Sequence, residues 1–132
     1  MKKIQSSGKV YIGKSKIDKK GRGVFAKVGI KNGETIEICP ILEIAENETH
    51  LLNKSSLVTY TIYFGKNKNR MALILGYGSL YNHSKNPNAI INIKSKGQTV
   101  IFTAIKDISK DEEIYFNYAP KASKNRALWF EV

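Results

Sequence analysis

The residues best suited to chemistry gather in one stretch, residues 76–88, which reads Gly-Tyr-Gly-Ser-Leu-Tyr-Asn-His-Ser-Lys-Asn-Pro-Asn. Within it, Asn82 and His83 place an amide and an imidazole side by side, so two kinds of hydrogen-bonding group are available at one point of the chain. The glycines allow close backbone approach or a positive φ, and the closing Asn-Pro-Asn is a strong turn signal. On these residues alone, a ligand-holding loop and a plain turn between two strands fit equally well.

The size and composition of the chain predict one soluble domain. It has 132 residues, of which 42% are apolar, enough for a single hydrophobic core. No run approaches the roughly 20 apolar residues of a membrane-spanning helix, and the N-terminus lacks the apolar segment of a secretory signal. We therefore expect a cytoplasmic protein with no membrane contact.

The cysteine content bears on disulfides and metal sites, and the net charge bears on the kind of partner. The single cysteine, Cys39, excludes an intramolecular disulfide, and Cys and His are too few for a structural zinc site, so we expect no metal. The net charge of +11 favours an acidic partner, such as nucleic acid held by a basic surface. Five glutamates from Glu34 to Glu48 form an acidic stretch, however, and such a face would suit a basic ligand.

Short apolar runs separated by turn signals predict a mostly β domain of several small sheets. The strands expected from β-branched and aromatic residues are 10–12, 23–28, 35–39, 58–64, 70–75, 89–94, 99–104 and 114–118. Pro40 should end the third strand, because proline cannot donate a ladder hydrogen bond. One short helix is expected at 46–52, as an insert on the surface.

Three motifs, in this order, resemble the SET domain of protein lysine methyltransferases. They are Gly-Arg-Gly-Val-Phe-Ala at 21–26, Asn-His-Ser with Pro-Asn inside 82–88, and Glu-Glu-Ile-Tyr-Phe-Asn-Tyr at 112–118. The resemblance runs from about residue 9 to residue 118, which leaves 119–132 as the tail of one domain over 1–132. It implies small β-sheets around a pseudoknot, in which the last strand passes under a loop and lies beside the Asn-His segment. The small size is similar to that of the minimal viral and bacterial members.

The resemblance also implies S-adenosylmethionine as methyl donor and a lysine side chain of a protein or peptide as acceptor. Gly21, Arg22 and Gly23 match the cofactor loop, whose backbone approaches the methionine part of the donor. Asn82 and His83 match the pair that holds the donor through side-chain and backbone hydrogen bonds.

Aromatic residues match the remaining positions of the family's site. Tyr118 matches the catalytic tyrosine, and Tyr60 matches the tyrosine of the lysine channel, with Tyr63 as an open alternative. Phe116 lies where the family sets how many methyl groups fit, and phenylalanine there favours di- or trimethylation. Trp129 resembles the C-terminal aromatic residue that covers the cofactor. The chain departs from the family in having Asn117 where Asp is usual before the catalytic tyrosine.

Methyl transfer to lysine needs a neutral amine. A lysine with a pKa near 10.4 is neutral in about one molecule per thousand near pH 7, which costs roughly 4 kcal/mol. A positive charge about 4 Å away, at an effective dielectric of about 20, supplies a repulsion of that order. The cationic donor therefore makes a dedicated carboxylate base unnecessary, and the rate should rise toward alkaline pH.

Two other functions and the identity of the substrate stay open at this point. A catalytically inactive SET-like module could bind a peptide or the cofactor without turnover, and a basic β domain with aromatic residues among its lysines could bind nucleic acid. If the chain is an enzyme, the acidic stretch would lie beside the peptide groove and favour a histone-like or otherwise basic substrate. The oligomeric state also stays open, since the minimal members that this chain resembles can pair as homodimers.

Overall fold

The structure is a computed structural model that describes residues 3–17, 21–65, 69–94, 96 and 98–118. The strands in this part of the chain are β1 (Val10–Lys14), β2 (Arg22–Ala26), β3 (Thr35–Ile44), β4 (Thr61–Phe64), β5 (Arg70–Ile74), β6 (Asn82–His83), β7 (Ala89–Lys94), β8 (Thr99–Ala104) and β9 (Glu113–Phe116). The helical elements are α1 (Thr49–Asn53) and the 3-10 turns η1 (Glu46–Glu48), η2 (Ser56–Tyr60) and η3 (Gly78–Leu80). The predicted mostly β class, with one short helix, is confirmed.

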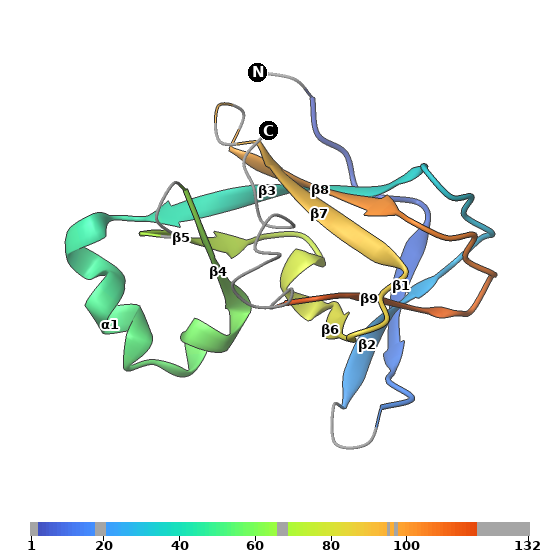
Figure 1. The fold of residues 1–132 in the computed structure, drawn as a ribbon, viewed down its shortest axis with the longest axis horizontal. Helices are drawn as coiled ribbons and strands as arrows, with labels where there is room; N and C mark the ends of the chain where they lie inside the picture. The colour runs from blue at the N-terminus through green and yellow to red at the C-terminus, as the bar shows by residue number, and fades with distance from the viewer. Residues whose placement is uncertain (1–2, 18–20, 66–68, 95, 97, 119–132) are drawn as a thin grey trace.

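The described strands form two sheets (Figure 1). The smaller has the order β1-β2-β9-β6, and the larger has the order β4-β5-β3-β8-β7. Described strand neighbours are antiparallel except β6 and β9, which are parallel, with Asn82 opposite Tyr115 and His83 opposite Phe116. The last described strand therefore lies between β2 and β6, and its expected place beside the Asn-His segment is confirmed.

Alternating apolar residues of β7 and β8 supply much of the core. Every second residue of both strands is buried: Ala89, Ile91 and Ile93 on β7, and Val100, Phe102 and Ala104 on β8. This period of two is typical of strands with one face on a core. The Phe102 ring stacks on Tyr81 with 4.1 Å between ring centroids, so the larger sheet packs directly against the 76–88 stretch.

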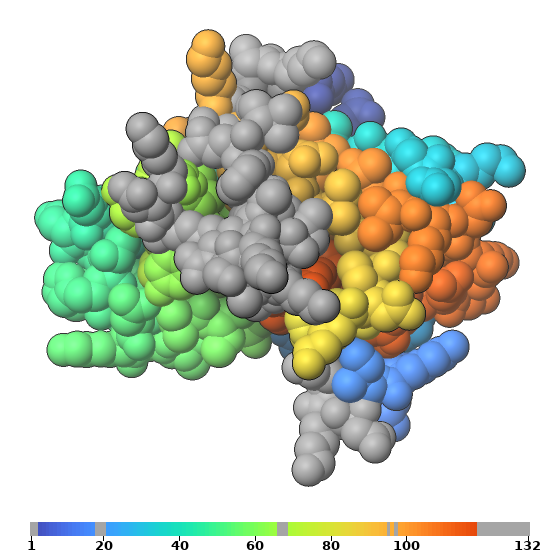
Figure 2. Space-filling view, in the orientation of Figure 1, coloured from blue at the N-terminus to red at the C-terminus, as the bar shows by residue number. Residues whose placement is uncertain are grey.

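The helical insert lies at the surface of the described fold. The elements η1, α1 and η2 contain no buried residue, and they form one end of the molecule, in green in Figures 1 and 2. The predicted helix at 46–52 is therefore present as a surface insert, with a 3-10 turn in place of its first residues. Among the described residues, no helix has the length and apolarity needed to cross a membrane.

The expected end of a strand at Pro40 is wrong, because β3 continues through it to Ile44. Pairing between β3 and β5 starts one residue later, with Ile41 opposite Ile74. The Pro40 carbonyl accepts from the backbone N–H of Leu75 at 2.9 Å. The missing proline N–H therefore falls at the end of a ladder, where it removes no hydrogen bond inside the paired strands.

The strand predicted at 58–64 is also partly wrong, since β4 begins only at Thr61. The Ser55 hydroxyl caps the preceding 3-10 turn by accepting from the Leu57 backbone N–H at 3.0 Å. The Thr61 hydroxyl donates to the Val58 carbonyl at 2.7 Å. These local side-chain bonds offer the backbone an alternative to a ladder, which overrides the β propensity of the run.

A β-bulge in β3 reverses the faces on which its residues lie. The pairing with β8 shifts between Thr35 and Glu37, so Ile36 is an extra residue. Beyond the bulge, Glu37 and Cys39 are buried, whereas Ile38 is 42% exposed. The bulge thus places a carboxyl group in the core and an isoleucine on the surface.

The acidic face predicted from five glutamates is not present as one surface. Glu37 is buried. Two others form ion pairs: Glu34 with Lys9 at 2.8 Å, and Glu43 with Arg70 at 2.6 Å. Only Glu46 and Glu48, at the start of the insert, are exposed without such a partner among the described residues.

Candidate active site

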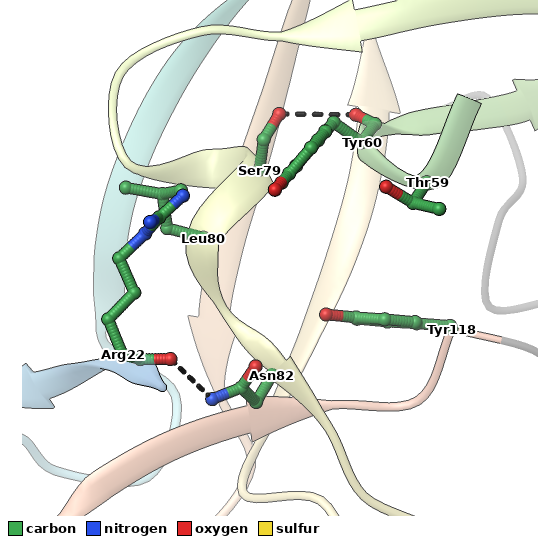
Figure 3. Close-up of a pocket in the computed structure, with 7 residues that line it drawn as sticks. All are labelled: Arg22, Thr59, Tyr60, Ser79, Leu80, Asn82 and Tyr118. Carbon is green, nitrogen blue, oxygen red and sulfur yellow. Dashed lines mark hydrogen bonds between the residues drawn. The ribbon is translucent and has the colours of Figure 1, made fainter. Parts of the chain in front are cut away.

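A cavity of about 220 Å³ lies where the insert, the 76–88 stretch and the end of β9 meet. The residues that line it are Arg22, Thr59, Tyr60, Ser79, Leu80, Asn82 and Tyr118 (Figure 3). They come from segments that are far apart in sequence and that the two sheets bring together. Four of the residues predicted for a site, Arg22, Tyr60, Asn82 and Tyr118, are among them.

Tyr118 is held from two sides. Its backbone N–H donates to Nδ1 of His83 at 3.0 Å, and its hydroxyl donates to the carbonyl oxygen of Tyr81. Burial, and to a lesser degree the neighbouring Tyr60, raise the pKa of Tyr118 to about 12. The hydroxyl therefore keeps its proton at neutral pH and directs its hydrogen at the Tyr81 carbonyl, so its oxygen still has lone pairs that can accept a further hydrogen bond. Figure 3 shows the oxygen end of Tyr118 pointing among the other residues that line the cavity.

Of the two candidate channel tyrosines, Tyr60 lines the cavity and Tyr63 does not. The carbonyl of Tyr60 accepts from the Ser79 hydroxyl at 3.2 Å, which ties the insert to the 76–88 stretch. The Tyr63 hydroxyl instead donates to Oδ1 of Asn53, at 2.7 Å, on α1. This geometry favours Tyr60 as the residue available to a ligand.

Asn82 is the centre of a buried polar cluster. Its Nδ2 donates to the Arg22 carbonyl at 2.8 Å, to Glu113 Oε2 at 3.0 Å and to the Ser15 hydroxyl at 3.2 Å. These bonds join β6 to β2, to β9 and to the end of β1. The amide nitrogen is thus occupied within the protein, so a ligand would meet the Oδ1 side or the backbone of Asn82.

The two glycines of the predicted cofactor loop are needed for different reasons. Gly21 has φ +76°, and a Cβ there would meet nothing within 4 Å, so its role is conformational. A Cβ on Gly23 would lie 2.2 Å from Glu113 Oε2 and 3.0 Å from Asn82 Nδ2. Gly23 is therefore needed for the close approach of β2 to the buried cluster.

Glu113 was not assigned a role from the sequence. It is 2% exposed, and its carboxyl accepts from the Ser15 hydroxyl at 2.8 Å, the Lys16 backbone N–H at 3.0 Å and the Tyr115 hydroxyl at 3.0 Å. Burial raises its pKa, but the hydrogen bonds from Asn82, Lys16, Ser15 and Tyr115 lower it by more, so the net pKa is below the usual value. In the sequence, the only signal of this buried carboxyl group is a glutamate inside an apolar strand.

Phe116 lies behind the cavity wall. It is 4% exposed, and its ring packs 4.9 Å from that of Tyr118 and 5.4 Å from that of Phe102. Its ring contacts that of Tyr118, but Phe116 is not among the described residues that line the cavity. Trp129 lies outside the described residues. No group of three His, Cys, Asp or Glu side chains suited to a metal ion occurs among those that are described.

The chain matches the family model described as the SET domain over residues 21–119. A histone-lysine N-methyltransferase of Schizosaccharomyces pombe, specific for H3 lysine-37, is 30% identical over 115 residues, which cover 86% of this chain and 73% of that protein. The family-model match over residues 21–119 contains all three motifs of the sequence.

Solved structures give the same family likeness. A candidate histone methyltransferase of Plasmodium falciparum superposes with a TM-score of 0.67 at 41% identity, covering 88% of this chain and 96% of that one. The polycomb repressive complex 2 of Chaetomium thermophilum, in an autoinhibited conformation bound to S-adenosylmethionine, superposes with a TM-score of 0.69 at 25% identity. That alignment covers 86% of this chain and 15% of the larger one.

Proposed function

This chain belongs to the SET domain family, and on that premise we propose that it transfers a methyl group from S-adenosylmethionine to a lysine of a basic, histone-like protein. The observation that carries the proposal is the convergence of Tyr118, Tyr60, Arg22 and Asn82 on one cavity. When bound, S-adenosylmethionine supplies an electrophilic methyl group on a cationic sulfur. The S. pombe relative, named for a histone lysine, and the complex solved with this donor support the choice of substrate and donor.

The residues around the cavity fit such a donor. Arg22 makes no ion pair among the described residues, so its guanidinium is available for the carboxylate of the methionine part. Gly21 leaves open space for a ligand, with no neighbour within 4 Å of the point where a Cβ would stand. The Oδ1 side of Asn82, whose Nδ2 donates to the Arg22 carbonyl, offers a further polar group beside Arg22. The resemblance to the family gives the His83 backbone a similar role.

Tyr118 is the residue proposed to orient the acceptor. Since its own hydrogen is directed at the Tyr81 carbonyl, its oxygen can accept an N–H of a neutral lysine amine and so fix the direction of the nitrogen lone pair. Tyr60 forms the opposite wall and keeps water from the reacting atoms. The only charged side chain lining the described cavity is the Arg22 cation, which disfavours an ammonium there.

The rate of methyl transfer should rise with pH. We expect single-turnover rates to increase from pH 6 to 9, by up to about tenfold per unit, because only the neutral amine reacts and a free lysine has a pKa near 10.4. Tyr118 should not reverse this trend, since its pKa of about 12 keeps the hydroxyl protonated over the whole range. A rate that is flat across this range would contradict the requirement for a neutral amine.

The proposed preference for basic substrates depends on two glutamates. Glu46 and Glu48 are exposed at the start of the insert whose other end, Thr59 and Tyr60, lines the cavity. Reversing both to lysine should lower the ratio of kcat/KM for basic over acidic peptides by about threefold or more, because rim charges act on encounter and selectivity. The double change to glutamine should give an intermediate ratio, and an unchanged ratio in both variants would refute this assignment.

Radiolabelled methyl transfer is the direct test of the function. The protein is incubated with labelled S-adenosylmethionine and with histone H3 or a lysate, and the labelled lysine is identified by mass spectrometry. Binding of S-adenosylmethionine without transfer to any substrate would favour an inactive module. Binding of DNA with a steep salt dependence, and no binding of the donor, would favour the nucleic-acid alternative.

A further inference from the structure

We propose that Glu37, buried in β3, is a positioning residue that fixes the hydroxyl of Tyr118 by acting through Tyr81. The inference rests on the proposed function of the cavity and extends it to a residue that does not line the cavity. It begins from a buried acidic group in the core that the proposed reaction does not use.

Glu37 is a buried carboxyl group with no cation as partner among the described residues. It is 7% exposed, and neither of the described ion pairs includes it. A carboxyl group is costly to bury unless hydrogen bonds satisfy it. Two bonds do so: the Tyr81 hydroxyl donates to Oε1 at 2.7 Å, and the Tyr77 backbone N–H donates to Oε2 at 3.0 Å. Both donors belong to the 76–88 stretch.

The first bond leads, through Tyr81, to the Tyr118 hydroxyl. Tyr81 is 1% exposed, and Glu37 holds its side chain while its ring stacks on Phe102, at 4.1 Å between centroids. The backbone carbonyl of the same residue accepts from the Tyr118 hydroxyl. Since the side chain of Tyr81 is fixed at its tip and along its face, its carbonyl has a fixed direction, and so does the O–H bond of Tyr118.

The second bond leads to the cavity wall. The Tyr77 N–H bonded to Glu37 immediately precedes η3, whose Ser79 and Leu80 line the cavity. Gly76, with φ +65°, lies so close that a Cβ there would be 2.8 Å from Glu37 Oε2. The turn is therefore shaped around the carboxyl group. The buried Glu37 side chain thus fixes both the part of the cavity wall formed by η3 and the Tyr118 hydroxyl that faces the cavity.

The consequence for the reaction concerns the orientation of the Tyr118 hydroxyl. While its hydrogen points to Tyr81, its lone pairs face the cavity and can accept from a lysine amine. If the Tyr81 carbonyl shifts, the hydroxyl can rotate and direct its hydrogen into the cavity, where it competes for the amine lone pair that must react. Loss of Glu37 or of the Tyr81 hydroxyl should thus slow the chemical step more than it weakens binding of either substrate.

The test compares Tyr81→Phe, Glu37→Gln and their combination with a matched control, Tyr63→Phe. The control also removes a tyrosine hydroxyl bonded to a side-chain oxygen, that of Asn53, but away from the cavity. We expect about a tenfold loss of kcat in either single variant, with KM for the substrate and Kd for S-adenosylmethionine within about twofold. The combined variant should lose no more kcat than the more impaired single variant, because both changes break the same chain of contacts from Glu37 through Tyr81 to Tyr118. The control should keep the wild-type kcat.

A second measurement does not depend on activity. With tyrosine labelled by ¹³C at Cζ, the resonance of Tyr118 is assigned by its absence in Tyr118→Phe. That resonance should shift in Tyr81→Phe and in Glu37→Gln, and should stay in place in Tyr63→Phe.

These two measurements separate the outcomes. An unmoved Tyr118 resonance, or a wild-type kcat in folded Tyr81→Phe and Glu37→Gln, would overturn the proposal. A loss of kcat that is matched by equal losses of donor binding and thermal stability would also overturn it, since it would indicate a purely structural role. If the wild-type protein transfers no methyl group at all, the proposed function fails, and the resonance of Tyr118 still decides whether Glu37 positions its hydroxyl.

Discussion

Replacing Tyr118 with phenylalanine is expected to lower methyl transfer by about 100-fold or more, while the affinity for S-adenosylmethionine stays within about twofold. The change removes one oxygen and leaves the ring contacts with Phe116 and His83 in place. The lost oxygen is the group that would orient the lysine amine, and loss of one preorganised polar group at a reacting centre typically costs a factor of 10² to 10³ in rate. Single-turnover transfer and calorimetric donor binding measure the two quantities separately.

Tyr63→Phe serves as the control for this prediction, because its hydroxyl bonds to Asn53 and does not reach the cavity. It should transfer methyl groups at the wild-type rate. If Tyr118→Phe kept most of its activity, the cavity would still be a binding site, but the orienting role assigned to this hydroxyl would be wrong. If the variant lost donor binding in proportion to activity, Tyr118 would act on the cofactor and not on the lysine.

The parts of the fold that the sequence predicted are those governed by local alternation. In β7 and β8 each residue's face follows from a period of two, and both strands were predicted with their observed bounds. The parallel pairing of β6 with β9 could not be predicted in this way, because no local pattern places Asn82 opposite Tyr115. That contact was expected only because three motifs together resemble a known family.

The buried carboxyl groups could not be predicted, because their positions depend on events outside the local pattern. Glu37 faces the core owing to the single extra residue, Ile36, at the bulge in β3, and a bulge has no reliable signal in one sequence. Glu113 is buried because Gly23 and Asn82 approach it from two other strands. The sequence alone therefore predicts one exposed acidic face, whereas in the structure its members have different partners and different burial.

Replacing Gly23 with alanine is expected to destabilise the protein by about 3 kcal/mol, because a buried charged group that loses a hydrogen-bond partner costs at least as much as the roughly 1 to 3 kcal/mol of a neutral one. The new Cβ would stand 2.2 Å from Oε2 and 2.9 Å from Cδ of Glu113, so the carboxyl group or the β2 backbone must move. Either movement separates Glu113 from Asn82. Urea denaturation at pH 7 measures the loss, and donor binding should weaken with it, since Arg22 and Asn82 share the same junction.

Two other glycines are controls for this substitution. Gly29→Ala has open space at the Cβ position and no positive φ, so it should change stability by less than about 0.5 kcal/mol. Gly21→Ala also has open space, but its φ of +76° should cost about 1 kcal/mol through backbone strain alone. A loss in Gly23→Ala no larger than that in Gly21→Ala would mean that the cluster adapts, and the close packing at Glu113 would not be a requirement of the fold.

The pH dependence of stability tests the same cluster independently. Glu113 has a lowered pKa in the folded state, so its contribution is present above the unfolded value near 4.3 and is lost as the pH falls through the folded value. The free energy of unfolding of the wild-type protein should therefore decrease below about pH 4.5. In Gly23→Ala the hydrogen bonds that lower this pKa are disturbed, so the decrease should be shallower, while the contributions of the surface pairs at Glu34 and Glu43 remain the same in both proteins. Parallel curves for the two proteins would show that Glu113 keeps its partners despite the added methyl group.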